Sequence, residues 1–553
     1  MKIFLLVLAL ALSALALAAE PPPPPGSEIT PPRLSFIDGA VSFWRPGAED
    51  WAPARVNLPL APGDALYTGA RSNLEIQTGP RAFVRAAENT QLGIVNLEPD
   101  FLQVKVTGGQ ASLDLRSIPA GHTVELDTPS AVFTIEHPGY YRVVVTDEVV
   151  HFVTRRGGRA TISVADAPPQ IISSSEEIVV RGTAAPSVET YVAPELDAWD
   201  RWNYARTDHE IEALSTRYVS PGVYGVGVLD QYGAWRIVPT YGAVWVPDRV
   251  AVGWAPYTTG SWIWDPYYGW TWVDIAPWGW APFHYGRWVL VSGFWAWAPG
   301  PVILRPVYAP ALVAFFSFSS SVSVSVGITG PAIGWVALAW GEPLHPWWGR
   351  PGFIGVPTWR GWAGPRIVDV KVHQHAKTPR ALVAVSEKQF GSGPVRPVRF
   401  SPAAPHDLKH IGDAHPVRPS PPSLVPERRE TVRPPAKLLS RPVVSTRPPR
   451  EAALPFKPDP ARKPALAAPA PRVVPPPKQA DASAAPPRAS FGDKGAERAR
   501  PAQPPRLEDL RRAPPAAAAP PKAPAAREPR ALPGRPANGV FPRSKAGSGG
   551  RRS

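Results

Sequence analysis

The sequence predicts a mainly all-β protein in three parts: a β-sandwich or β-roll, a second β domain built of short hairpins, and a long disordered tail. Three observations lead to this prediction. Residues 33–182 are short apolar runs with period two, which is typical of strands. Of the 22 Trp residues, 20 lie between positions 199 and 362, and 37 of the 75 Pro lie in 391–553. This uneven composition indicates separate regions of the chain, independently of any motif.

The N-terminus carries the pattern of a secretory signal. A basic Met1-Lys2 start precedes an uncharged apolar run to Leu17 and small residues ahead of Glu20. We therefore expect a cleaved signal peptide at 1–19 and a Pro-rich linker at 20–32. The apolar run is short for a membrane span, so the mature chain is expected to be periplasmic or secreted, without a transmembrane helix. With no Cys, disulfides and thiolate chemistry are excluded.

Residues 33–182 alternate apolar runs with Gly-containing turns, which predicts about ten strands around one core. Gly tolerates positive φ, so Gly63, Gly69, Gly108 and Gly109 are expected at corners. The expected core face is formed by Leu34, Phe36, Val41, Phe43, Leu74, Ile76, Phe83, Val104, Val106, Leu113, Leu115, Val124, Leu126, Val132, Ile135, Val143, Val145, Ile162 and Val164.

Three stretches of this domain resemble the FecR-type β domain. Leu60-Ala-Pro-Gly-Asp-Ala-Leu-Tyr-Thr-Gly69 is similar to that family's Gly-Asp-x-Leu-x-Thr-Gly turn. Thr128-Pro-Ser-Ala131 and Gly139-Tyr-Tyr-Arg-Val143 are similar to its following strands. The resemblance implies a β fold and an envelope location. Known members relay a siderophore signal through a cytoplasmic segment and a membrane helix ahead of the β domain, and neither pattern precedes residue 33.

After a linker at 183–194, a second domain is expected at 195–390. Residues 195–218 have a helical pattern, with an apolar stripe that includes Leu196, Trp199 and Leu214. Four Trp-x-Trp pairs follow, at 262/264, 270/272, 278/280 and 295/297. On a strand, residues i and i+2 share a face, so each pair would lay two indoles side by side. Flanking Gly and Pro would end each strand within a few residues.

This block resembles the uncharacterised Trp/Tyr/Gly/Pro-rich domain found after FecR-type or similar β domains in exported bacterial proteins. The phrases that carry the resemblance are 230–235, 241–247, 277–288 and 334–343. The resemblance implies no activity.

The Trp array allows two interpretations. Exposed indoles with Asp265, Asp274 or Arg287 could bind a glycan or a Pro-rich peptide; alternatively, the indoles form the core, which we favour for any single Trp. As a candidate contact surface we select one aromatic set: Trp262, Trp264, Tyr267, Tyr268, Trp270, Trp272, Trp278 and Trp280.

No catalytic, metal or cofactor site is predicted. His373-Gln-His375 has the spacing of a weak metal pair, with Glu342 and His345 as distant candidates, but surface histidines explain it better. Asp265 and Asp274 could be imagined as a hydrolase pair, but turn residues are the simpler interpretation. Nucleotide-binding and nucleophile motifs are absent from the sequence.

Residues 391–553 are expected to be disordered, because they lack periodicity and are dominated by Pro, Ala, Arg and Lys. The segment has 31 basic and 12 acidic residues, a net charge of +19, whereas 1–390 has 28 basic and 33 acidic residues, a net charge of −5. Such a tail could bind anionic envelope polymers or act as a solvated spacer. We expect no specific nucleic-acid recognition.

The function that these features favour is a non-enzymatic, exported binding or scaffolding module, with an envelope polymer or an envelope protein as its partner. A FecR-like signalling component and a glycan-binding protein with exposed Trp and Tyr platforms remain alternatives. An unrecognised envelope hydrolase is the least favoured.

Overall fold

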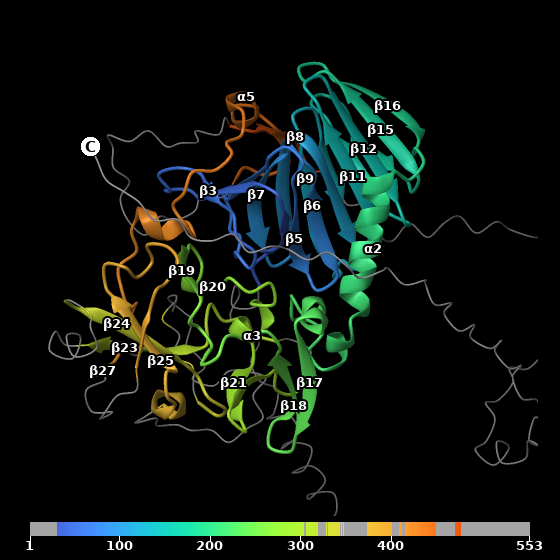
Figure 1. Cartoon of the computed structure of the whole chain (residues 1–553). Coiled ribbons are helices and arrows are strands. Elements are labelled where there is room, and N and C mark those ends of the chain that lie inside the picture. The colour runs from blue at the N-terminus through green and yellow to red at the C-terminus, as the bar shows by residue number, and fades with distance from the viewer. Residues whose placement is uncertain are drawn as a thin grey trace, which may run out of the picture. The chain divides into compact units, whose positions relative to one another are not determined.

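The computed structural model describes residues 30–303, 306–318, 328, 330–342, 344, 347, 373–400, 409–411, 415–449 and 470–476. Strands dominate these residues, so the predicted mainly β fold is confirmed (Figure 1). The predicted signal peptide, most of the Pro-rich linker and residues 477–553 lie outside the described residues. Within the described residues, no helix is both long and apolar enough to cross a membrane.

The N-terminal domain is a sandwich of two sheets that share one strand. The first sheet has the order β1 (Arg33–Asp38), β5 (Asn73–Gly79), β6 (Ala82–Ala86), β8 (Phe101–Leu115), β11 (Gly139–Val145), β12 (Val149–Arg155), β15 (Glu176–Arg181), β16 (Ser187–Val192). The second sheet has the order β3 (Ala52–Pro53), β2 (Val41–Trp44), β4 (Ala65–Thr68), β7 (Gln91–Glu98), β8, β9 (Thr123–Asp127), β10 (Val132–Ile135), β13 (Ala160–Ser163), β14 (Gln170–Ile172). The linker predicted at 183–194 therefore contains a strand, β16.

Strand β8 joins the two sheets at a corner that requires glycine. Its first half pairs with β7 and β9, and its second half pairs with β6 and β11. Between the halves, Gly109 has φ +97°, and a Cβ there would lie 2.3 Å from the Thr90 Oγ1. Only glycine accepts both constraints. Behind this corner the sheets face one another, because Phe133 of β10 stacks on Phe152 of β12 with ring centroids 3.9 Å apart.

The Gly63-Asp64 turn holds a buried ion pair. Asp64 accepts hydrogen bonds from the Ala61 amide at 2.8 Å and from two nitrogens of Arg45, at 2.8 and 2.6 Å. Arg45, which is also fully buried, donates to the Trp264 carbonyl at 2.9 Å and so ties this domain to the Trp-rich one. The structure thus gives the Asp of this motif a structural role.

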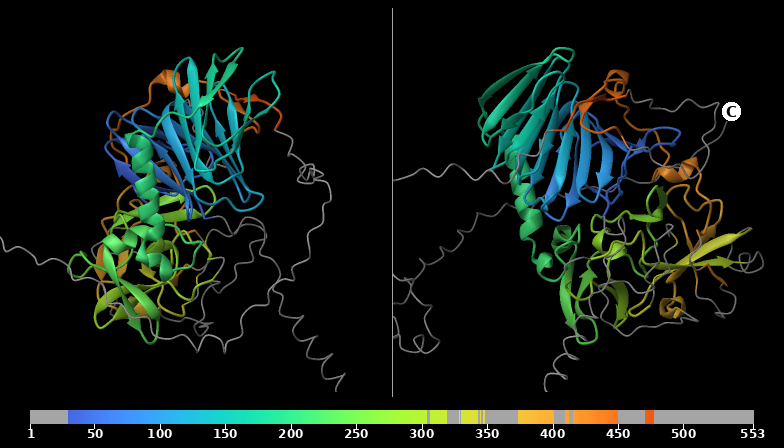
Figure 2. Two further views of the ribbon diagram at one scale, coloured as in Figure 1. Left: turned by 90° about the vertical axis from the view of Figure 1, so that its right-hand side faces the viewer. Right: turned by 180° about the vertical axis from the view of Figure 1, so that it is seen from behind.

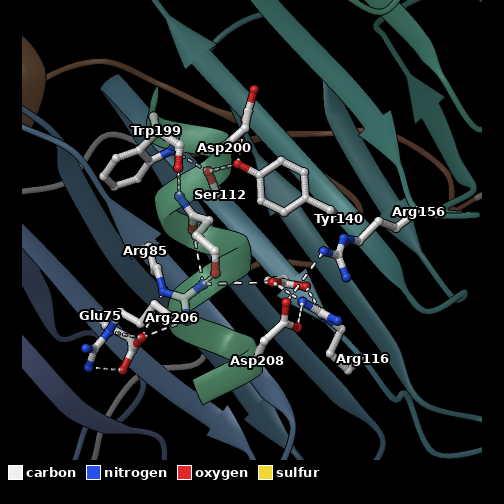
Figure 3. Close-up of polar contacts among 12 residues, drawn as sticks. Glu75, Arg85, Ser112, Arg116, Tyr140, Arg156, Trp199, Asp200, Arg206 and Asp208 are labelled. Atoms are coloured by element: carbon white, nitrogen blue, oxygen red, sulfur yellow. Dashed lines mark hydrogen bonds and ion pairs between the residues drawn. The ribbon is translucent and has the colours of Figure 1, made fainter. Parts of the chain in front are cut away.

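Helix α2 (Ala198–Glu212) packs on the first sheet with a polar face, which differs from the apolar stripe expected from sequence (Figure 3). Its buried residues are Asp200, Asn203 and Thr207, whereas Leu214 beyond its end is 48% exposed. The Tyr140 hydroxyl donates to the Asp200 carboxylate at 2.7 Å. The sheet face that the helix meets carries charged side chains, so charge pairs join the helix to the sheet beside ring contacts such as Tyr204 with Tyr140, whose centroids are 4.9 Å apart.

The strongest of these helix contacts centre on Glu75. Its carboxylate lies 2.8 Å from the buried guanidinium of Arg85 and accepts two bonds from Arg206 of α2, at 2.7 and 3.0 Å. The two arginines outweigh burial and lower the pKa of Glu75 to about 2. The carboxylate is therefore charged at any ordinary pH and holds the helix on the sheet.

Replacing Arg206 with Met should lower the free energy of unfolding by about 2 kcal/mol, because two charge-assisted hydrogen bonds to Glu75 are lost while Arg85 still compensates its charge. Denaturant midpoints measured at neutral pH test this. Arg201→Ala is the matched control on the same helix, since that exposed side chain bonds only the Leu196 carbonyl. Equal stability of the two variants would contradict a charge-held helix.

The described residues of the Trp-rich domain form three small sheets. A four-stranded sheet has the order β17 (Gly233–Val238), β18 (Gly242–Pro247), β22 (Phe294–Ala298), β21 (Arg287–Val291). A hairpin is formed by β19 (Gly260–Asp265) and β20 (Gly269–Asp274). A five-stranded sheet has the order β26 (Val398–Phe400), β25 (Leu382–Ser386), β24 (Ala332–Ala337), β23 (Val313–Phe318), β27 (Lys409–His410). The short helices are η1 (Leu214–Arg217), η2 (Gly227–Gln231), α3 (Ala281–His284) and η3 (Gln374–Lys377).

Residues 415–449 form a C-terminal strap that packs on both domains (Figure 2). It contains η5 (Pro421–Leu424), α5 (Ala436–Leu439) and β28 (Val444–Ser445), and β29 (Arg472–Val473) pairs with β28 in parallel. The sequence prediction of a disordered segment from 391 therefore does not describe 415–449. Buried apolar side chains such as Leu424 and Val444, each 1% exposed, hold the strap in place.

Candidate interaction site

The β19–β20 hairpin brings two Trp-x-Trp pairs into register. Trp262 lies opposite Trp272, and Trp264 lies opposite Trp270. Their ring centroids are 5.3 and 5.7 Å apart, with edge-to-face geometry. The prediction of short strands is correct for these two Trp-x-Trp pairs, but the ring contacts run across the hairpin and not along each strand. Aromatic cross-strand pairs of this kind stabilise a hairpin.

The candidate aromatic surface, however, is interior. Trp262, Trp264, Tyr268, Trp270, Trp272, Trp278 and Trp280 are at most 9% exposed, and only Tyr267 is half-buried. The physical reason is visible at Trp262, whose ring packs on Phe315, Trp335 and Phe390 of the five-stranded sheet and its neighbouring loop. In a domain poor in Leu and Ile, the indoles form the core, so the predicted contact surface is wrong for these seven rings.

The pair Trp278 and Trp280 does not lie on a strand. The two residues precede α3, and the Trp280 ring lies 4.5 Å from His284 and 5.5 Å from Tyr308 between ring centroids. Pro282 in the first turn of α3 favours a helix start here. Spacing alone cannot distinguish this turn from a strand.

The polar residues considered for glycan binding are engaged internally. Asp265 accepts hydrogen bonds from the amides of Tyr267 and Tyr268 at 2.7 and 2.9 Å, and so closes the hairpin turn. Arg287 donates to the carbonyls of Gly286 and Glu342 at 2.8 and 3.0 Å. These are the roles of turn and strand-end residues.

Asp274 is also structural, but its environment is unusual. Its carboxyl accepts the Ala276 amide at 2.9 Å and the Trp272 indole N–H at 3.0 Å. Burial outweighs these bonds and raises the pKa of Asp274 to about 7. The group therefore keeps its proton below neutral pH in the folded chain.

From this we expect the free energy of unfolding to fall as the pH rises from about 4 to about 7. In that window the folded chain retains a proton that unfolded Asp274 has lost, and the slope is at most about 1.4 kcal/mol per pH unit. Asp274→Asn should remove this contribution. The measurement is the difference between wild-type and variant stability at several pH values; a difference that does not change with pH would contradict the buried carboxyl.

The histidine pair is buried and bonded within the fold. His373 Nδ1 lies 3.0 Å from Glu342 Oε2, and His375 Nδ1 lies 2.9 Å from the Ala337 carbonyl. The expectation of surface histidines is therefore wrong. In the described part of the chain no group of three or more metal-ligating side chains is assembled, and His345 lies outside it.

A second candidate site lies where the strap crosses the N-terminal domain. Three polar side chains occupy one register position on neighbouring strands: Asn96 of β7, Gln103 of β8 and Glu125 of β9. We call them the polar row. Each is at most 3% exposed although polar. Buried polar groups need partners, and strap residues supply several of them.

Consecutive strap residues bond to consecutive members of the polar row. The Thr446 amide donates to Glu125 Oε1 at 2.9 Å, and its hydroxyl donates to the other carboxylate oxygen. The amide groups of Gln103 and Asn96 donate to the carbonyls of Arg447 and Pro448 at 3.3 and 3.1 Å. The strap thus crosses three strands, and the row binds mostly its backbone.

Two arginines flank this contact. Arg441 donates to the carbonyls of Thr107, Thr146 and Asp147 at 2.7–2.8 Å. Arg447 pairs with Glu98 at 3.0 Å, and its guanidinium lies 3.8 Å from the centroid of the Phe101 ring. A guanidinium has enough fixed donors to reach the three carbonyls around Arg441, and it has a flat face that can stack on the Phe101 ring, as Arg447 does.

Between the arginines, Val444 anchors the strap. Its amide donates to the Thr128 carbonyl at 2.9 Å, and its side chain packs with Val132 and Val474. Residues 443–446 are all buried. Because a residue before proline favours extended backbone, Arg441-Pro442 and Arg447-Pro448 keep both ends of this segment straight.

A second carboxyl lies next to the polar row. Asp127 accepts a hydrogen bond from the same Gln103 amide at 2.8 Å. Burial, reinforced by the neighbouring Glu125 carboxylate, raises the pKa of Asp127 well above its usual range. Burial also lowers the pKa of Lys105, the nearby amine. Burial therefore disfavours the charged forms of both Asp127 and Lys105 on this face.

Sequence reasoning missed this site because the row exists only after the strands are paired. One sequence signal could have indicated ordered segments beyond residue 391, the strap among them. The phrase Val-Arg-Pro occurs at 395–397, 417–419 and 432–434. The structure holds the backbone of each Val: the Val395 amide by the Gly260 carbonyl, the Val417 carbonyl by the Trp270 indole and the Val432 carbonyl by the Ser42 hydroxyl.

Comparison with known proteins finds a family match for the central block. Residues 226–342 match a family of unknown function, DUF6600. No curated protein matches the chain. Two crystal structures of a candidate anti-sigma factor from Parabacteroides distasonis show a slight likeness, with 15% and 12% identity and TM-scores of 0.21 and 0.17. The likeness covers 26% and 28% of this chain and 64% and 60% of theirs, so this chain spans less than two thirds of their length.

Proposed function

We propose that the protein is an exported, non-enzymatic scaffold of the cell envelope. Its N-terminal and Trp-rich domains form a folded platform, and its basic C-terminal extension, residues 477–553, attaches this platform to an anionic envelope polymer. The observation that carries this proposal is the strap. Its contacts with the Trp-rich domain include Ser261 Oγ to the Pro426 carbonyl at 3.1 Å, and its contacts with the N-terminal domain include the polar row. Tension on the extension would therefore be transmitted to both domains.

Charge supports the polymer as the partner of the extension. Residues 477–553 have 16 basic and 6 acidic residues, a net charge of +10. Dispersed cations attract polyanions without sequence recognition, and this attraction is weakened by salt. The internal bonding of Asp265 and Asp274 supports a platform without hydrolytic chemistry.

The FecR-type motifs support the envelope location of the same platform. A signalling role was the alternative that they suggested. In the structure, however, the Gly63-Asp64 turn and its partner Arg45 serve the fold and the domain contact. We propose the scaffold because the strap supports it, and a signalling component is the alternative that the motifs suggest.

Co-sedimentation with purified cell-wall sacculi tests the proposal. The chain without residues 1–19 should pellet at low salt and be released at high salt, and the same chain ending at residue 476 should stay in solution. Vesicles with 30% anionic lipid form a parallel arm that separates a membrane surface from the wall polymer. Salt-insensitive pelleting of both chains, or no pelleting of either on any support, would contradict the proposal.

A further inference from the structure

The face under the strap has the chemistry of a peptide-binding surface. A sheet face that merely faced solvent would leave Asn96, Gln103 and Glu125 exposed. Here they are buried with the strap in place, and strap backbone atoms accept from or donate to each of them. Backbone bonding gives affinity for any extended chain, so selectivity has to come from the flanking contacts.

Those flanking contacts select arginine at two positions. The three carbonyls around Arg441 and the Glu98–Phe101 pair around Arg447 lie at the two ends of one extended segment, six residues apart in the strap. Between them, the side chain of Val132 contacts Val444. The strap residues in contact with this surface therefore follow a pattern: an arginine, a buried aliphatic side chain three residues later, and a second arginine three residues after that.

We propose that this face of the N-terminal domain is a binding site for an extended, arginine- and proline-containing segment of a partner protein, and that strap residues 441–448 occupy it as an internal competitor. This goes beyond the scaffold function, because it concerns the platform and not the basic extension. The acidic side chains of the site, Glu98 and Glu125, complement the charge of such a segment.

The strap keeps the site closed to weak ligands. A segment in the same chain competes at an effective concentration in the millimolar range. A partner segment must therefore bind more tightly than the strap or act when the strap is released. The half-exposed Arg447, whose side chain is 49% exposed, is the end from which displacement would begin.

Fluorescence anisotropy of a labelled synthetic peptide tests the proposal. The peptide is that of residues 439–449, added to the chain without residues 1–19 and to its Arg441→Ala/Arg447→Ala variant, in which the internal competitor is weakened. We expect the variant to bind the peptide at least tenfold more tightly than the wild type. Equal binding by the two chains would overturn the proposal.

Two controls locate the site. Adding Glu125→Ala to the variant should abolish the gain, because the amide and the hydroxyl of the peptide threonine then lose their acceptor; an undiminished gain would place binding elsewhere. A peptide with Lys in place of both arginines should bind at least fivefold more weakly, since an ammonium lacks the guanidinium fork. Equal binding of the two peptides would overturn recognition by guanidinium.

Two further measurements cover the remaining outcomes. If near-ultraviolet circular dichroism shows that the double variant is unfolded, Arg447→Ala alone replaces it, and the same tenfold criterion applies at peptide saturation. Light scattering of the wild type detects strap exchange between copies. Dimers that exclude the peptide would mean that a second copy is the occupant, which would overturn the partner protein.

Discussion

Replacing Arg45 with Ala should lower the free energy of unfolding by about 3–5 kcal/mol, the cost of leaving one charge of a buried pair uncompensated. Asp64 would remain in the interior without the two bonds that Arg45 donates. The bond from Arg45 to the Trp264 carbonyl would also be lost, and with it a link between the two domains. Denaturant unfolding followed by Trp fluorescence measures this loss.

Two matched variants make the Arg45 result specific. Arg55→Ala removes an ion pair with Glu427 of the strap, but the Arg55 side chain is 43% exposed, so this change should cost no more than about 1 kcal/mol. Arg45→Met combined with Asp64→Asn should recover part of the loss, because no unpaired charge remains buried. Similar losses for Arg45→Ala and Arg55→Ala would show that the interior pair does not hold the domains.

Replacing Trp262 with Ala should cost about 3–5 kcal/mol, which is the range for removing a buried indole from a core. Trp262 is 1% exposed, and its ring lies 5.3 Å from that of Trp272 and 5.5 Å from that of Phe390 between centroids. The loss of these contacts should lower the unfolding midpoint and shift the emission of the remaining indoles to longer wavelength.

Tyr267 is the control for Trp262, because it is the half-buried member of the same aromatic set. Tyr267→Ala should cost about 1 kcal/mol or less, as expected for a side chain outside the core. If Trp262→Ala kept wild-type stability and instead lost binding to cell-wall fragments, the ring would be a contact residue and the core assignment would fail.

The sequence predicts much of this fold because the apolar–polar alternation of a strand is visible within a few consecutive residues. Alternation indicates Leu34, Ile76, Val104 and Leu113 as core residues, and all four are at most 1% exposed. The hairpin of Trp262 and Trp272 follows from period two and the intervening turn. For helix α2 the sequence predicts an apolar buried stripe, but the buried face is polar. The sheet beneath the helix supplies charged partners that no local pattern reveals.

The candidate site was less predictable for a different reason. Asn96, Gln103 and Glu125 are distant in sequence, and they form a row only through the register of β7, β8 and β9. The strap was also hidden, since Pro- and Arg-rich composition is typical of disorder. Its docking depends on a few anchors, such as Val444, and on a surface that is already folded.

Amide hydrogen exchange in the strap is the most direct test of the central claim, that strap residues 444–448 are docked on the N-terminal domain, with Thr446, Arg447 and Pro448 on the polar row. The Val444 and Thr446 amides donate to the Thr128 carbonyl and to Glu125. They should exchange orders of magnitude more slowly than an unstructured peptide of the same sequence, and faster in Arg441→Ala/Arg447→Ala. Exchange of both amides at the unstructured rate in the wild-type chain would contradict the docked strap.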